Sequence, residues 1–276
     1  MISNKLLFKS VNLVPWHFRA LIKRLPIVAH LQRYLFNKFL SGKDFIYEIN
    51  AGPAKGLKYP VSLPKDKLIW MGTYEAELAN IASKSVTQNA ICYDIGGYRG
   101  FFSGVFAIAG AKSVYVFEPF PENFEQIKHL IELNPNLPIK VKQMAIGNKN
   151  TITKFNVMPD ESMGKLVNST FQKDRKANRV INVSLKKIDS LIRDDGFPTP
   201  DIIKIDVEGA EVNVLRGAQE ALRLKHPQLF IEAHSKKLCM DCSSILKSLD
   251  YQVTILETGL APSGNNVPEI SHLLCR

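Results

Sequence analysis

The chain has 276 residues, of which 45% are hydrophobic, so it is long and apolar enough to bury a large core. Its four scattered cysteines do not make a disulfide framework, and no apolar run approaches the ~20 residues that span a bilayer. These features argue against a disulfide-stapled secreted module and an integral membrane protein. They predict a soluble, cytoplasmic protein.

The net charge of +10 belongs to the N-terminal segment. Residues 1–43 hold eight basic and no acidic side chains, which leaves 28 basic against 26 acidic groups in residues 44–276. This distribution argues against a nucleic-acid substrate, because an enzyme that binds nucleic acid is expected to have a basic surface around its active site. Apolar residues in 1–43 follow parts of a helical pattern, broken at Pro15 and Pro26. We expect a basic helical extension packed on the main domain; the alternative is peripheral contact with an anionic inner membrane face.

Residues 44–89 are predicted to form a connector, with a hairpin-rich stretch over 44–66 and a short helix over 75–83. From residue 90 strands and helices alternate, as is typical of a doubly wound parallel sheet in an α/β domain over 90–276. Strands are predicted at 90–95, 113–118, 139–145, 202–206 and 229–233, helices at 101–109, 121–133, 211–222 and 238–249, and a terminal antiparallel pair at 251–256 and 270–275. Two β-like runs, 151–157 and 180–185, flank a polar stretch over 159–178 that we expect to be a mobile loop.

A glycine cluster follows the first strand of this domain. The run Cys92-Tyr-Asp-Ile-Gly-Gly-Tyr-Arg-Gly100 ends a strand and opens a helix, and glycines there let a ligand approach the main chain closely. We expect Asp94, Gly96 and Gly97 to bind the methionine end of S-adenosylmethionine (SAM). Glu118 ends the next strand, 24 residues beyond Asp94, where its carboxylate suits a ribose diol.

The rest of the cofactor site is predicted from position. The run Met144-Ala145-Ile146, at the end of the third strand, is the expected adenine wall. A nicotinamide dinucleotide is the alternative, because its fold also places an acidic residue after the second strand. That fold uses Gly-x-Gly-x-x-Gly around a pyrophosphate. Here the cluster reads Asp-x-Gly-Gly-x-x-Gly, and the carboxylate of Asp94 would repel a diphosphate, so SAM is favoured.

A second polar cluster is predicted where the fourth and fifth strands end. Asp206 and Glu208 follow the fourth strand, and Glu232 and His234 follow the fifth. Ligands sit at the carboxyl ends of neighbouring strands in open α/β sheets, so these four side chains are the candidate catalytic residues. We expect His234 or Asp206 to take a proton from a hydroxyl, with Glu208 and Glu232 orienting the group. Two alternatives remain: a divalent metal held by the cluster, and a salt-bridged loop anchor around Lys204.

Four segments together resemble the FkbM-type methyltransferase family. They are 94–103, the Phe-Glu-Pro run at 117–119, the Ile-Lys-Ile-Asp-Val-Glu-Gly-Ala-Glu run at 203–211 and the Ile-Glu-Ala-His run at 231–234, within a resemblance that covers residues 72–256. It implies a Rossmann-like class I methyltransferase fold with seven strands, and SAM-dependent O-methylation of sugar, glycolipid or polyketide hydroxyls. By position it adds Pro119, Thr73 and Glu75 to the cofactor site, to which Asp206 is also assigned. The turn departs from the family's usual pattern at Gly97-Tyr98-Arg99, which we expect to recontour the methionine pocket.

The sequence lacks the motifs that two other kinds of methylation would need. Amino-group methylation of bases would need Asp/Asn-Pro-Pro-Tyr/Phe after the fourth strand, and cytosine C-methylation a nucleophilic cysteine there; the sequence has neither. A non-catalytic SAM-binding, membrane-associated accessory protein and a nucleotide-sugar dehydrogenase remain as alternatives. The Cys239-x-x-Cys242 pair is interpreted as part of an amphipathic helix, and His272 as a packing or surface residue.

Overall fold

The computed structural model describes residues 44–63, 66–70, 73–157, 164–166 and 179–276. The predictions for residues 1–43 and for most of the stretch 159–178 therefore lie outside the described residues. The chain divides into two compact units: Met1–Phe45 with Val61–Ile69, and Ile46–Pro60 with Trp70–Arg276. The second unit holds every residue of the predicted site.

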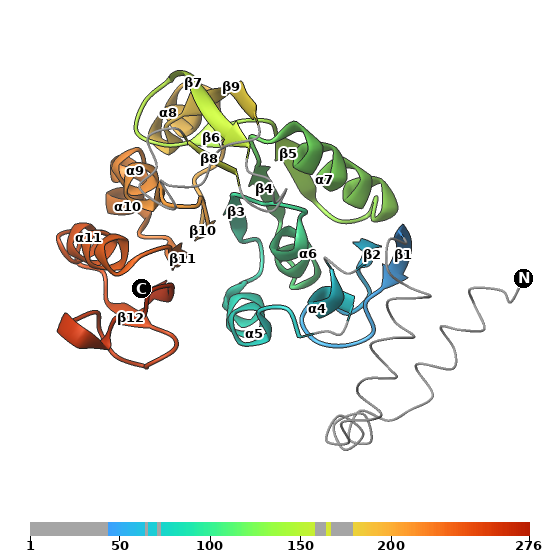
Figure 1. Ribbon diagram of the computed structural model, residues 1–276, viewed down its shortest axis with the longest axis horizontal. Helices are drawn as coiled ribbons and strands as arrows, with labels where there is room; N and C mark the ends of the chain where they lie inside the picture. Colours follow the sequence, from blue (N-terminus) through green and yellow to red (C-terminus); the bar gives the residue numbers. More distant parts are fainter. Residues whose placement is uncertain (1–43, 64–65, 71–72, 158–163, 167–178) are drawn as a thin grey trace, which may run out of the picture. The chain divides into compact units, whose positions relative to one another are not determined.

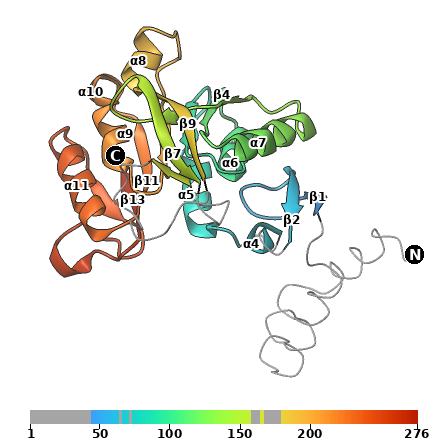
Figure 2. The same ribbon diagram turned by 45° about the horizontal axis from the view of Figure 1, so that its top comes forward.

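A seven-stranded sheet forms the centre of the second unit (Figures 1 and 2). Its strands are β3 (Ile91–Ile95), β4 (Ser113–Phe117), β5 (Ile139–Lys142), β10 (Ile202–Ile205), β11 (Gln228–Ala233), β12 (Val253–Ile255) and β13 (Ser271–Cys275), in the order β12-β13-β11-β10-β3-β4-β5. β13 is antiparallel to both of its neighbours, while the pairs from β11 to β5 are parallel. The predicted α/β fold with seven strands and a terminal antiparallel pair is confirmed.

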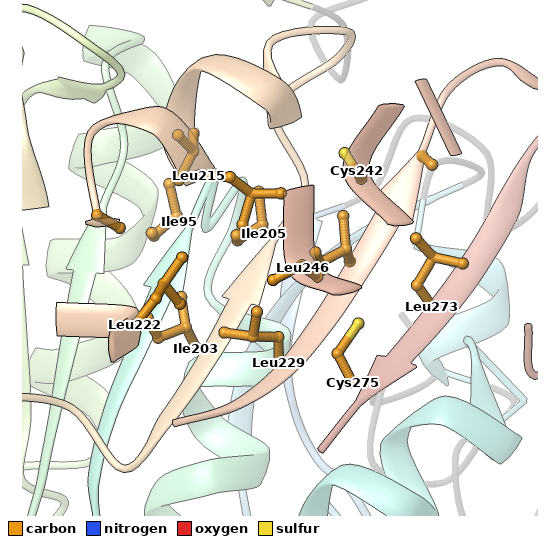
Figure 3. Packing of buried hydrophobic residues seen from close by; sticks show 14 of the residues in the cluster. Ile95, Ile203, Ile205, Leu215, Leu222, Leu229, Cys242, Leu246, Leu273 and Cys275 are labelled. Carbon is orange, nitrogen blue, oxygen red and sulfur yellow. The ribbon is translucent and has the colours of Figure 1, made fainter. Parts of the chain in front are cut away.

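Helices cover the sheet because each strand presents alternate side chains to opposite faces. They are α5 (Ala76–Ser85), α6 (Phe101–Ile108), α7 (Pro121–Leu133), α8 (Ile188–Arg193), α9 (Glu211–Arg216), α10 (Gln219–Lys225) and α11 (Lys236–Lys247). Ile203 and Ile205 of β10 pack in a buried cluster with residues of α9, α10 and α11 (Figure 3). Between them in sequence, Lys204 faces the other way and lies over the Phe102 ring of α6.

The chain turns earlier than predicted after the third sheet strand. β5 ends at Lys142, whose carbonyl accepts a hydrogen bond from the Met144 N–H at 3.0 Å, and the chain leaves the sheet. Ala145 and Ile146 form β6 of a second sheet with β9 (Arg179–Lys186), β7 (Thr151–Val157) and β8 (Gly164–Leu166), in the order β6-β9-β7-β8. The two β-like runs are thus confirmed as strands. The short β8 lies within the stretch that was expected to be a loop.

The helix predicted over 211–222 is instead two helices, α9 and α10, separated at Gly217. A Cβ on Gly217 would lie 1.9 Å from the carbonyl oxygen of Gly147, so the backbones meet there. The carboxylate of Asp189 accepts hydrogen bonds from the Glu220 and Ala221 N–H groups, at 3.1 and 3.0 Å. These bonds satisfy donors that a new helix start leaves open, so the chain begins α10 afresh.

The connector contains two paired strands, β1 (Asp44–Glu48) and β2 (Lys58–Ser62), a short helix α4 (Lys67–Trp70) and then α5. The predicted strands and helix are therefore present, with α5 extending two residues beyond the expected end. Among the described residues, no helix has the length and apolar character needed to cross a membrane.

Candidate active site

The glycine turn holds three strands together at their carboxyl ends. Gly96 has a φ of 79°, and a Cβ there would lie 1.7 Å from the carbonyl oxygen of Asp206 on the neighbouring strand. The N–H groups of Gly96 and Gly97 point to the Phe117 carbonyl oxygen, at 2.9 and 3.4 Å. A Cβ on Gly97 would meet Val116 at 2.2 Å. Side chains are excluded at Gly96 and Gly97 because the chain beyond β10 and the side chain of Val116 on β4 approach so closely there.

Asp94 lies buried at the end of β3. Its Oδ2 accepts a hydrogen bond from the Ser103 hydroxyl at 2.5 Å, while its buried Oδ1 has no hydrogen-bond partner among the described residues. Burial raises the pKa of Asp94, and the nearby Lys204 opposes that shift. An unsatisfied buried carboxylate oxygen at this strand end suits a ligand with an ammonium group, as the methionine end of SAM has.

Glu118 lies one strand further along, with only 4% of its surface exposed. Each carboxylate oxygen accepts one backbone hydrogen bond at 2.9 Å, Oε2 from Tyr98 and Oε1 from Phe120. The Asn123 side chain also bonds to this carboxylate, which can accept about four hydrogen bonds in all and so keeps capacity for a further hydroxyl. Burial outweighs these bonds and raises the pKa of Glu118 to about 8.

Lys204 is the buried cation of the site. Its Nζ lies 3.1 Å from Asp206 Oδ2 and 4.8 Å from the centre of the Phe102 ring. Burial alone would lower the pKa of Lys204, but the carboxylates of Asp206, Asp94 and Glu75 raise it above the usual value. This ion pair is the anchor considered from the sequence, and it coexists with the carboxylate and histidine cluster.

The four predicted catalytic residues meet around one imidazole nitrogen. His234 Nε2 lies 3.7 Å from Asp206 Oδ1, 3.4 Å from Glu208 Oε2 and 3.6 Å from Glu232 Oε1. Its Nδ1 is 2.9 Å from Oε1 of Glu211, which is fully buried and also accepts the Gly209 N–H. Burial lowers the pKa of His234, but the hydrogen bond to Glu211 and the carboxylates raise it to about 9.

His272 extends the cluster, and its interpretation as a packing or surface residue is wrong. It stands opposite Glu232 in the antiparallel pair of β11 and β13, with its Nε2 3.7 Å from Glu232 Oε2 and its Nδ1 2.5 Å from Glu257 Oε1. Glu75 completes a group with Glu232 and His272 whose ligand atoms all lie within 4.8 Å of one another. The alternation of the last strand offered a signal, but its register against β11 did not follow from the sequence.

The carboxylates differ in electrostatic environment. Burial raises the pKa of Glu208 to about 7, and it raises the pKa of Asp206 above the usual range. For Glu232, burial also acts upward, but the facing His272 and Lys204 hold its pKa down at about 2. The site thus pairs one firmly ionised carboxylate, Glu232, with Glu208, whose pKa lies near neutral pH, a combination typical of acid–base sites.

Three of the six described non-glycine residues with positive φ lie at this site. Glu75, Tyr98 and Glu208 have φ values of 40°, 48° and 52°, in the left-handed region that side chains rarely adopt. Strained residues of this kind are typical of ligand-binding sites. Glu208 reaches His234 through this turn and not by strand alternation, because β10 ends at Ile205.

The remaining predicted residues are placed as follows. Thr73 and Pro119 are half-buried beside Glu75 and Glu118 in sequence. Ile146 belongs to the buried cluster beneath α8 to α11, and Ala145 packs with residues of β7 and β9. The Arg99 guanidinium donates to the Pro60 carbonyl at 2.9 Å, in the connector. Cys239 and Cys242 are buried free thiols on one face of α11, in agreement with the amphipathic-helix interpretation.

A family model and a curated relative that match this chain both describe methyltransferases. The methyltransferase FkbM domain matches residues 94–253, more than half of the chain. Hexuronic acid methyltransferase AglP of Haloferax volcanii is 24% identical over 152 residues, which are 54% of this chain and 58% of AglP. The chain thus matches little more than half the length of that relative.

Two solved structures are also similar. Methyltransferase FkbM from Methylobacillus flagellatus KT has 19% identity and a TM-score of 0.49, over 68% of this chain and 44% of that one. SMU.1697c from Streptococcus mutans, in complex with SAH, has 11% identity and a TM-score of 0.44, over 72% of this chain and 95% of that one.

Proposed function

The chain belongs to the FkbM methyltransferase family, and we propose that it transfers a methyl group from SAM to a hydroxyl of a sugar, glycolipid or polyketide-type acceptor. The similarity to a hexuronic acid methyltransferase supports a sugar among these classes. The convergence of Asp206, Glu208 and Glu232 on His234, at the strand ends beside the glycine turn, is the observation that carries the proposal.

The residues at the ends of β3 and β4 fit SAM. The unpartnered Asp94 Oδ1 would accept from the ammonium group, and the two oxygens of Glu118 from the ribose diol. When bound, SAM supplies an electrophilic methyl group on a sulfonium. We keep Thr73, Glu75, Pro119, Ala145 and Ile146 as proposed cofactor contacts.

The second cluster would prepare the acceptor. The site would hold the acceptor oxygen in line with the methyl–sulfur bond of bound SAM, which would give up its methyl group and leave as S-adenosylhomocysteine, while the hydroxyl proton would pass to a carboxylate. Because the pKa of His234 is about 9, its ring is protonated at neutral pH, which favours Asp206 over His234 as the base. His234 would then hold the surrounding carboxylates in place. Alignment of the oxygen with the methyl group supplies much of the rate.

The test is transfer of label from methyl-tritiated SAM to a panel of oligosaccharides, glycolipids and polyketides. We expect the unaltered protein to label at least one hydroxyl-bearing class, and Asp206→Asn to lose about 100-fold or more of that rate. Asp241→Asn, an exposed carboxylate paired with Lys237, is the matched control and should label normally. SAM binding with no transfer to any class would instead favour an accessory protein, and full activity of Asp206→Asn would remove the proposed base.

A further inference from the structure

We propose that Asp206, Glu232 and His234, with Glu208 beside them, hold one divalent transition-metal ion. Binding of the ion does not depend on the proposed function. Only the effect of the ion on an acceptor hydroxyl rests on that function. The three principal ligand atoms lie within 4.8 Å of one another, on the carboxyl ends of two adjacent parallel strands. The hydrogen bonding of His234 Nδ1 decides which groups its Nε2 faces.

Glu211 fixes the orientation of the His234 ring. Its carboxylate can only accept, so the 2.9 Å contact makes His234 Nδ1 the donor and turns Nε2 toward the other carboxylates. His234 is 4% exposed, and Glu211 is fully buried. A histidine that binds a metal through one nitrogen commonly donates its other N–H to a carboxylate in this way, which fixes the tautomer. The ion would displace the Nε2 proton that the ring carries when the ion is not bound, while the Nδ1 proton stays hydrogen-bonded to Glu211.

The spacing around Nε2 matches a ligand shell. The three carboxylate oxygens stand 3.4 to 3.7 Å from it, beyond the roughly 2.7 to 2.9 Å of a charge-assisted hydrogen bond. Ligand atoms about 2.1 Å from one ion stand roughly 3.0 Å apart in an octahedron and roughly 3.4 Å apart in a tetrahedron. The observed separations lie just outside the tetrahedral value, so a small contraction would close the shell around an ion.

In Asp206 and in Glu232, the two carboxylate oxygens face different partners. Asp206 directs Oδ2 to Lys204 at 3.1 Å and Oδ1 toward His234. Glu232 directs Oε2 toward His272 and Oε1 toward His234. One oxygen of each carboxylate is therefore anchored by a cationic or basic side chain. The other oxygen faces the shared point between the strands, so the side chains are oriented before any ion arrives.

Unsatisfied atoms next to this group give a second line of support. Glu75 Oε2 and His272 Nε2 are buried and have no hydrogen-bond partner among the described residues, and both belong to side chains that flank Glu232. Glu211 Oε2 is also buried without one. Buried polar atoms are normally satisfied, so the two open carboxylate oxygens, of Glu75 and Glu211, leave capacity for a positive charge beyond that of Lys204.

The donor set selects the class of ion. One imidazole nitrogen with carboxylate oxygens suits Mn²⁺, Fe²⁺ or Zn²⁺ better than Ca²⁺, which takes oxygen ligands alone. An ion here would bind the acceptor oxygen and lower the pKa of its hydroxyl, so that the proton leaves to a nearby carboxylate more easily. It would also offset the negative charge that an acidic acceptor such as a hexuronic acid would meet at this rim.

The experiment measures metal binding without SAM or acceptor, so its outcome does not depend on methyl transfer. Chelator-treated full-length protein is titrated with Mn²⁺, and the free ion is followed by electron paramagnetic resonance, with Zn²⁺ and Mg²⁺ as competitors. We expect one saturable Mn²⁺ site, displaced by Zn²⁺ and little affected by equimolar Mg²⁺. Absence of saturable binding of both Mn²⁺ and Zn²⁺ would overturn the proposal, while label transfer could still occur.

Variants then place the ion. We expect Asp206→Asn and His234→Gln to weaken Mn²⁺ binding about 100-fold or more, and Asp241→Asn to leave it unchanged. His272→Gln should weaken it less than about 3-fold, because His272 only anchors the second oxygen of Glu232. The reverse pattern, with His272→Gln abolishing binding and His234→Gln tolerated, would contradict the assigned ligands. Circular dichroism and thermal melts of each variant separate lost binding from lost folding.

Discussion

The Glu211 carboxylate holds His234 by its Nδ1 atom at 2.9 Å, and both side chains are buried. Glu211 opens α9, just after the strained turn at Glu208, so the helix start and the histidine at the end of β11 are locked together. Because Glu211 touches neither cofactor nor acceptor in the proposed reaction, we regard it as a positioning residue. This relationship orients the imidazole on which three further carboxylates converge.

Glu211→Gln should separate positioning from cofactor binding. Glutamine keeps the shape of glutamate but removes the charge that favours His234 Nδ1 as a donor, so the ring loses its fixed orientation. We expect the turnover number to fall about 10- to 100-fold, the pH profile of turnover to shift, and the dissociation constant of SAM to stay within about 2-fold. Steady-state kinetics and calorimetry measure these quantities. Unchanged turnover and pH profile in a folded variant would refute this role.

Glu118→Gln should weaken SAM binding. Hydrogen bonds from a ribose diol to the Glu118 carboxylate, which is ionised above its pKa of about 8, contribute about 1.5 to 3 kcal/mol each, and a neutral amide retains only part of that, so the titrations are run at pH 9. We expect the dissociation constant to rise about 10- to 100-fold in calorimetric titrations with SAM and with S-adenosylhomocysteine. Glu125→Gln, an exposed carboxylate on α7, is the matched control. Equal affinities of the two variants would remove Glu118 from the ribose site.

The raised pKa of Glu118 also predicts how the free energy of unfolding of the cofactor-free protein depends on pH. Burial raises the pKa of Glu118 from 4.5 to about 8, so the folded protein binds a proton that the unfolded chain has already released. Its stabilising contribution is full below pH 4.5 and is lost as pH rises through 8. Between pH 6 and pH 9 it should lower the free energy of unfolding by roughly 3 kcal/mol.

Urea unfolding at both pH values measures this effect. In Glu118→Gln the decrease between pH 6 and pH 9 should be smaller by that amount, since glutamine does not titrate. The remaining decrease belongs to the other buried groups. An identical decrease in the variant and the unaltered protein would show that Glu118 does not hold the proton.

Gly96→Ala tests the close approach of the strands. The φ values of Gly96 and Gly52 are nearly equal, 79° and 77°, so alanine incurs a similar backbone cost of about 1 to 2 kcal/mol at either position. Only at Gly96 does the new Cβ meet a neighbour, the Asp206 carbonyl at 1.7 Å, whereas nothing lies within 4 Å at Gly52. We therefore expect Gly96→Ala to be far less stable than Gly52→Ala in thermal melts. Equal melting temperatures would contradict the contact.

The sequence predicted the sheet well because its strands are short apolar runs between glycine and proline signals. It predicted the cluster around His234 because residues at adjacent strand ends must meet. The path of Glu208 did not follow from the sequence: strand alternation ends at Ile205, and a left-handed turn brings the side chain to His234. Local backbone geometry of this kind depends on what packs around the turn, which a single sequence does not state.

Two other residues were missed for reasons of register and packing. His272 joins the site only because β13 pairs with β11 in a register that sets it opposite Glu232. Glu211 carries no signal beyond its place at a helix start, where acidic residues are common. The break at Gly217 was also missed, since it follows from an approach of the Gly147 backbone across seventy residues of chain.

The most direct test of hydroxyl methylation is to identify the atom that receives the methyl group. Transfer from ¹³C-methyl SAM to a neutral hexose-containing acceptor and to a hexuronic acid, followed by NMR of each product before and after mild alkali, identifies the accepting atom. Methylation of a hydroxyl predicts a methyl ether that survives alkali in at least one product. A methyl signal that alkali removes from every labelled product would mean that a carboxylate is the acceptor, and would contradict hydroxyl transfer.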